Sequence, residues 1–71
     1  MKDIIINDHY LTWSEAVDHL VEQGVDYIGW ANDGVPYPKG NPFTIRQGDF
    51  GTNTGVYYYP ESNKVICVDM S

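Results

Sequence analysis

Two histidines, each preceded by an aspartate, have the residue types that bind metal ions or exchange protons in catalysis. The pairs are Asp8-His9 and Asp18-His19, and imidazole and carboxylate groups serve as zinc ligands and as general acids and bases. Adjacent residues of a helix point roughly 100° apart, and His9 falls on a different element from His19. The spacing therefore favours neither chemistry, and we expect His19 to pair with Glu15 at i, i+4 on an exposed helix surface.

One cysteine could act as a nucleophile, and a group of glycines could form a nucleotide-binding loop. Cys67 is the only cysteine, and it lies in the apolar run Val65-Ile66-Cys67-Val68. No signature of a catalytic cysteine surrounds it, so we expect it to pack as a small buried hydrophobic residue. Gly48, Gly51 and Gly55 match neither the dinucleotide-binding spacing nor the P-loop spacing. The sequence therefore predicts no cofactor, no metal ion and no enzymatic activity.

Aromatic residues make up 14% of the chain. Tyr57 and Tyr59 alternate with Val56 and Tyr58 along one predicted strand, so one pair faces the helix and the other faces outward. Tyrosine offers a large contact area at low entropic cost, which makes it frequent in binding hot spots. Tyrosine also suits strands that bind nothing. The aromatic residues that we expect to contact a partner are Tyr37, Phe50, Tyr57 and Tyr59.

Three acidic residues recur along one side of the predicted helix. Glu15, Asp18 and Glu22 stand at i, i+3 and i+7, with no Lys or Arg among them. Like charges at this spacing weaken a helix slightly. The stripe is either a solvated face that adds solubility or a negative surface that docks on a basic partner and speeds association. We include these three acids among the candidate partner-binding residues.

The element that carries this stripe is a helix from about Trp13 to Gln23. Thr12 and Glu15 have the spacing of a capping box, which satisfies unpaired backbone donors at the start of a helix. Gly24 offers the positive φ that commonly follows a helix. A short helix is marginal alone in water, so its apolar face must pack on a sheet. Apolar residues fall on one face at Trp13, Ala16, Val17, Leu20 and Val21.

Residue alternation and turn chemistry predict strands on both sides of the helix. We expect strands over residues 3–7, 25–30, 43–47, 55–59 and 64–69, with a short return strand over 9–11. The last two form a hairpin through the turn Pro60-Glu61-Ser62-Asn63. The stretches 35–42 and 48–55 are rich in proline and in glycine, threonine and asparagine respectively. We expect them to be surface loops, which often carry binding residues.

Length and cysteine content limit the architecture and the compartment. Seventy-one residues suffice for one domain with a modest core, and oligomerisation is a common way to support so small a core. A single cysteine excludes an internal disulfide and favours a reducing compartment. The apolar run at the start is too short for a signal sequence, and no segment approaches a membrane span. We therefore expect a cytoplasmic protein without a membrane partner.

The charge limits the class of partner. Ten Asp and Glu against four Lys and Arg give a formal net charge of −6, which repels phosphate backbones and argues against direct nucleic-acid binding.

We expect one α+β domain over residues 1–71, with a helix packed on a mostly antiparallel sheet of three to five strands in the order β(β)αβββ.

For function we expect a protein-binding module, an inhibitor or adaptor that occupies a basic site on a larger partner, such as a nucleic-acid-binding site. Its size and charge are those of small acidic phage proteins that block host restriction or CRISPR systems, and this comparison is one of bulk properties. The alternative is a small structural domain that forms a homodimer through its aromatic face.

Overall fold

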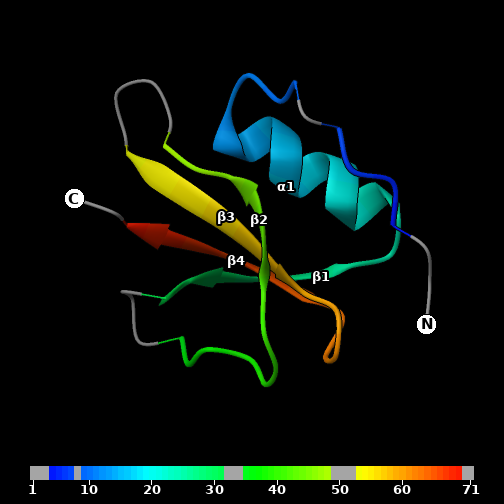
Figure 1. The fold of residues 1–71 in the computed structure, drawn as a ribbon, viewed down its shortest axis with the longest axis vertical. Helices are drawn as coiled ribbons and strands as arrows, with labels where there is room; N and C mark the ends of the chain where they lie inside the picture. The colour runs from blue at the N-terminus through cyan, green and yellow to red at the C-terminus, as the bar shows by residue number, and fades with distance from the viewer. Residues whose placement is uncertain (1–3, 8, 32–34, 49–52, 70–71) are drawn as a thin grey trace.

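The fold is one helix packed on a four-stranded mixed sheet. The computed structural model describes residues 4–7, 9–31, 35–48 and 53–69 (Figure 1). The elements are α1 (Trp13–Glu22), β1 (Asp26–Trp30), β2 (Phe43–Arg46), β3 (Thr54–Tyr59) and β4 (Lys64–Asp69). The sheet order is β1-β4-β3-β2, in which β1 pairs with β4 in parallel and the other two pairs are antiparallel. The predicted α+β class and mostly antiparallel sheet are confirmed.

Local interactions at both ends explain where α1 starts and stops. The Thr12 hydroxyl accepts a hydrogen bond from the Glu15 backbone N–H at 3.1 Å, and the Glu15 carboxylate accepts one from the Leu11 N–H at 2.9 Å. The first contact satisfies a backbone donor that the start of the helix leaves unpaired, and the second satisfies the donor of the residue before the N-cap. Gly24 follows the helix with φ of 94°, where a side chain would be strained. The predicted helix is confirmed, ending one residue earlier than expected.

The main core lies between α1 and one face of the sheet. Ala16, Val17 and Leu20 are buried and pack in one cluster with side chains of β3 and β4, including Val56 and Val65. Because burying apolar side chains is the main favourable term in folding, this layer holds the helix in place. Trp13 and Trp30 are half-buried at its margin, with their rings 5.1 Å apart in an edge-to-face arrangement.

The apolar helix face is narrower than predicted. Val21 is 46% exposed, so its inclusion in the core face is wrong. It is one residue beyond Leu20, and the step of about 100° turns it away from the sheet.

The predicted strand before the helix does not form. Residues 4–7, which we call the N-terminal strap, have no strand pairing, and neither does the predicted return strand over 9–11; Asp3 lies outside the described residues. All four strands follow the helix, so the predicted order β(β)αβββ is wrong. The strap runs beside α1 (Figure 1), and the backbone of Ile5 bonds to the side chains of His19 and Gln23. Side-chain hydrogen bonds replace the pairing that a neighbouring strand would have supplied.

The sheet face away from α1 is partly covered by the loop that leads into β2. Tyr57 pairs with Ile66 across β3 and β4, and cross-strand partners share a face. Ile66 is fully buried although it lies outside the helix-facing cluster. The predicted loop over 35–42 is confirmed, and it runs on the side of the strands opposite α1 (Figure 1). A side chain at Gly40 would clash with Glu61 in the β3–β4 turn, so the loop lies directly against the hairpin.

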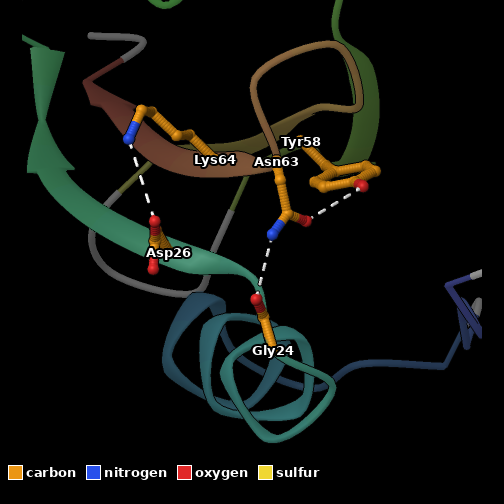
Figure 2. A network of polar contacts seen from close by, with 5 residues as sticks. All are labelled: Gly24, Asp26, Tyr58, Asn63 and Lys64. Carbon is orange, nitrogen blue, oxygen red and sulfur yellow. Dashed lines mark hydrogen bonds and ion pairs between the residues drawn. The ribbon is translucent and has the colours of Figure 1, made fainter. Parts of the chain in front are cut away.

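The hairpin is tied to the helix end by Asn63, as Figure 2 shows. Asn63 has φ of 56°, a left-handed conformation that asparagine tolerates better than most residues. Its side-chain amide donates to the Gly24 carbonyl at 3.0 Å and its side-chain oxygen accepts from the Tyr58 hydroxyl at 3.4 Å. The Asp26 N–H donates to the Asn63 carbonyl at 3.1 Å. One turn residue therefore joins the helix C-terminus, β1 and the predicted β3–β4 hairpin, which is confirmed.

The two outer strands are irregular. The β1–β4 pairing shifts register between Tyr27 and Trp30, where Gly29 has φ of 106°, and the β2–β3 pairing shifts between Thr44 and Arg46. Such shifts interrupt the ladder and bend the strand locally. Neither edge of the sheet is a straight strand.

Candidate functional site

A polar groove along the outer side of α1 is the candidate functional site. It encloses about 460 Å³ and lies between the helix and the segment that leads into it. We call it the acidic groove, because three carboxylates contribute to it and none of the described residues that line it is Lys or Arg. The lining residues are Asn7, Tyr10, Thr12, Ser14, Glu15, Asp18, His19 and Glu22.

The three predicted acids all line this groove. Glu15, Asp18 and Glu22 lie three and four residues apart, so α1 presents them in one row. The Glu15 carboxylate also accepts the Leu11 N–H at 2.9 Å, so it has a structural role in the helix cap. Glu22 is the last residue of α1, where the helix dipole disfavours a negative charge. Among the described lining residues the row of carboxylates therefore has no Lys or Arg beside it, and Glu22 stands at the end of the helix that disfavours it.

The basic residues that the structure describes have other surroundings. Lys64 Nζ lies 3.8 Å from the carboxylate of Asp26 on the sheet (Figure 2). The Arg46 guanidinium donates to the Tyr10 carbonyl at 2.8 Å, and Arg46 does not line the groove. Lys39 does not line the groove either, so none of the three described Lys and Arg residues does.

Tyr10 and His19 form the wall between the groove and the core. Tyr10 is 5% exposed, and its hydroxyl accepts a hydrogen bond from the Asn7 N–H at 3.1 Å. Its ring lies 5.5 Å from the imidazole of His19, centroid to centroid. His19 Nε2 is 2.9 Å from the Ile5 carbonyl oxygen. The predicted pairing of His19 with Glu15 is wrong, because the imidazole bonds to the strap and the Glu15 carboxylate bonds to the Leu11 N–H.

The described residues contain no group of three or more His, Cys, Asp or Glu side chains placed to hold a metal ion. Asp8 lies outside them. Cys67 is fully buried, which confirms its predicted place in the core. Burial raises the pKa of its thiol, and a hydrogen bond with Tyr27 partly offsets that rise. What the groove offers chemically is hydrogen-bond acceptors and negative charge, which are suited to binding cations.

Among the predicted aromatic residues that the structure describes, Tyr37, Tyr57 and Tyr59 do not line the acidic groove. Tyr37 is 60% exposed on the loop over the far face of the sheet, and Tyr57 is half-buried. Tyr59 is only 6% exposed, so its placement on an accessible surface is wrong. Burial, and then the neighbouring hydroxyls of Tyr37 and Tyr57, raise its pKa. Phe50 lies outside the described residues.

Sequence reasoning missed Asn7, Tyr10 and Ser14, which line the groove, and Gln23, which holds the strap beside the helix. Asn7 carries a recognisable signal, because its side-chain oxygen accepts the His9 N–H at 2.9 Å, a local turn that asparagine favours. Tyr10 and Gln23 carry no such signal. Their contacts, with the Asn7 N–H and with the backbone of Ile5, depend on how the strap folds back over the helix.

No helix among the described residues has the length and apolar character needed to cross a membrane. Comparison of the chain with protein-family models, with curated proteins and with solved structures gave no significant match. The function must therefore be argued from the groove itself.

Proposed function

We propose that this protein is a small acidic binding module, an inhibitor or adaptor, whose groove along α1 occupies a basic site on a larger protein. The observation that carries the proposal is the row of Glu15, Asp18 and Glu22 in one groove that no described Lys or Arg lines. Carboxylates form short, charge-assisted hydrogen bonds with arginine and lysine, and arginine can bind a carboxylate through two parallel bonds.

The placement of these charges supports a role in binding over a role in stability. Like charges three and four residues apart cost roughly 0.2–0.5 kcal/mol per pair. Glu22 adds an unfavourable interaction with the C-terminal end of the helix dipole. A surface that needed only solubility could intersperse Lys or Arg with these acids and avoid the cost. The repulsion within the row of acids weakens the helix, but the row makes this surface uniformly negative. That is expected if the surface recognises positive charge.

A basic nucleic-acid-binding site is the partner surface that fits this charge best. Arginine binds carboxylate and phosphate with the same planar geometry, so a row of carboxylates can compete for residues that hold a phosphate backbone. A phage inhibitor of a host restriction or CRISPR enzyme is the form of this function that the small size and the net charge of −6 favour.

The experiment compares two variants of equal net charge. Asp18→Asn combined with Glu22→Gln removes two groove charges, and Glu61→Lys makes the same change in the β3–β4 turn, which contributes nothing to the groove. Both variants carry a formal net charge of −4, against −6 for the wild type. Glu15 is left unchanged because its carboxylate caps the helix.

Partners are captured from lysate at low and high salt, and the association rate with the captured protein is then measured for each variant. We expect the groove variant to associate about tenfold more slowly, or slower still, and to lose much of the salt dependence, because steering depends on local charge. The Glu61→Lys variant should stay within about twofold of the wild type. Equal slowing by both variants, or by neither, would show that the groove does not bind the partner.

The homodimer alternative is weakened by the burial of Tyr59, because this residue is one of the aromatic residues expected to contact a partner and is only 6% exposed. Molecular mass in solution across a range of concentrations tests it directly. A dimer that Tyr37→Ser dissociates would revive this alternative.

A further inference from the structure

The outer side of α1 already holds a piece of polypeptide backbone. The Ile5 N–H donates to Gln23 Oε1 at 2.7 Å, and Gln23 Nε2 donates to the Ile5 carbonyl at 2.8 Å. His19 Nε2 lies 2.9 Å from the same carbonyl oxygen. A single glutamine amide thus pairs with both backbone groups of one residue, as a neighbouring strand does in a sheet. We call His19 and Gln23 the backbone clamp.

The clamp does not read the side chain of the residue that it holds. The side chain of Ile5 is 72% exposed, and the three clamp contacts go to the N–H and C=O groups that every residue except proline possesses. These hydrogen bonds are exposed to solvent, and the strap takes no part in the sheet. Segments with few buried contacts and solvent-exposed hydrogen bonds open most easily.

The strap passes from the backbone clamp at Ile5 to the acidic groove within two residues. Asn7, two residues after Ile5, lines the groove. Its side chain is neutral, and its oxygen accepts the His9 N–H. Where three carboxylates gather, the strap therefore offers no positive charge. An extended segment held at the same clamp, with arginine or lysine at the position of Asn7, would complement the groove better than the strap does.

We propose that the backbone clamp is a binding site for an extended polypeptide segment, that the strap occupies it in the free protein, and that a basic segment of the partner replaces the strap. The partner residue in the clamp is unrestricted apart from its backbone N–H, and two residues later the partner presents arginine or lysine to the groove. This proposal rests on the proposed function, because the same groove supplies the specificity for positive charge.

A partner segment must compete with the strap for the clamp, so its positive charge decides whether it can displace the strap. A segment tethered by a few residues acts at an effective concentration in the millimolar range. A neutral segment that offered only the same backbone hydrogen bonds could not displace the strap at ordinary concentrations. A basic segment adds an interaction that the strap lacks, so only partners with a correctly placed cation should open the strap.

The test uses the full-length protein and capped hexapeptides with isoleucine third and arginine fifth. One control peptide has glutamate in place of the arginine, and another has an N-methyl group on the isoleucine, which removes the N–H that Gln23 accepts. We expect each control to bind about tenfold more weakly or worse, the change that about 1.4 kcal/mol produces. At saturation with the arginine peptide, hydrogen exchange at the Ile5 amide should become fast.

Variants of the protein test the same contacts from the other side. Gln23→Ala should weaken binding of the arginine peptide about tenfold, whereas Gln47→Ala, an exposed glutamine away from the groove, should not. Ile5→Pro lacks the N–H that ties the strap to Gln23, so it should bind the arginine peptide severalfold more tightly than the wild type. Circular dichroism of each variant checks that the helix remains.

The outcomes separate this proposal from the proposed function. If the arginine peptide binds and Asp18→Asn with Glu22→Gln weakens it, but N-methylation has no effect and the Ile5 amide stays protected, the groove binds positive charge and strap replacement is wrong. If the wild type forms a dimer that exchanges straps, the occupant is a second copy and the proposal is also wrong. Absence of peptide binding to Ile5→Pro, where the strap no longer competes, would overturn it as well.

Discussion

Replacing Asn63 tests whether one turn residue joins the helix to the hairpin (Figure 2). Asn63→Ala removes the 3.0 Å hydrogen bond to the Gly24 carbonyl, worth about 1 kcal/mol, and the longer 3.4 Å bond with Tyr58, worth about 0.5 kcal/mol. Alanine at φ of 56° costs roughly another 1 kcal/mol, because its Cβ crowds the backbone there. We therefore expect Asn63→Ala to lower the free energy of unfolding by about 2–3 kcal/mol.

That loss is large for a chain of this size. At roughly 0.05–0.15 kcal/mol per residue, a domain of 71 residues has a total stability of about 4–11 kcal/mol. Urea unfolding followed by tryptophan fluorescence measures the change, because the Trp13–Trp30 contact is lost when the core opens. The denaturant slope should be unchanged if the variant affects only stability.

Two further substitutions at the same position separate the contributions. Asn63→Gly keeps the left-handed backbone and should lose only about 1.5 kcal/mol. Asn63→Asp keeps the acceptor for Tyr58 but not the donor to Gly24, and should lose about 1 kcal/mol. The control is Ser62→Ala in the same turn, whose buried hydroxyl has no hydrogen-bond partner among the described residues, so its removal should not lower stability. Equal losses for Asn63→Ala and Asn63→Gly would refute the backbone argument, and a stable Asn63→Asp would refute the role of the amide donor.

Two other predictions follow from buried groups. Thr54 is 1% exposed and its hydroxyl has no hydrogen-bond partner within the part of the chain that the structure describes, so Thr54→Val should raise the free energy of unfolding by about 1 kcal/mol in urea titration; a loss of stability would mean that the hydroxyl makes a necessary contact. Burial raises the pKa of Cys67 above 9.0 and that of Tyr59 above 10.0, so each group holds its proton more tightly in the folded state. Stability from these groups is fully present below those values and should fall as the pH rises beyond them. Thermal unfolding should show a smaller alkaline loss in Cys67→Ala and Tyr59→Phe than in the wild type.

The helix and the hairpin could be predicted because their signals are local. The capping pair Thr12 and Glu15 and the periodicity of Ala16, Val17 and Leu20 specify a helix without reference to the rest of the chain. The acids were placed on one face by spacing alone. The groove itself could not be predicted, because its other wall comes from the segment before the helix.

The predicted N-terminal strand and the predicted exposure of Tyr59 are wrong because each depends on a segment that covers another. The apolar N-terminal residues predicted a strand, but Gln23 and His19 pair with the Ile5 backbone and take the place of a neighbouring strand. Alternation put Tyr57 and Tyr59 on one face of the predicted strand, yet it could not reveal that Tyr59 is buried. Both outcomes depend on where an irregular segment packs, and irregular segments have no residue period that reveals their contacts.

The irregular outer strands affect whether the protein aggregates at high concentration. Under the proposed function, the protein occupies its target one to one and must reach at least the concentration of that target. Straight, unpaired strand edges would then recruit further copies into fibrils as the concentration rose. Register shifts in β1 and β2, with Gly29 at positive φ in β1, interrupt the template that a recruited strand would need. Neither outer strand therefore offers the straight edge that self-templated growth needs.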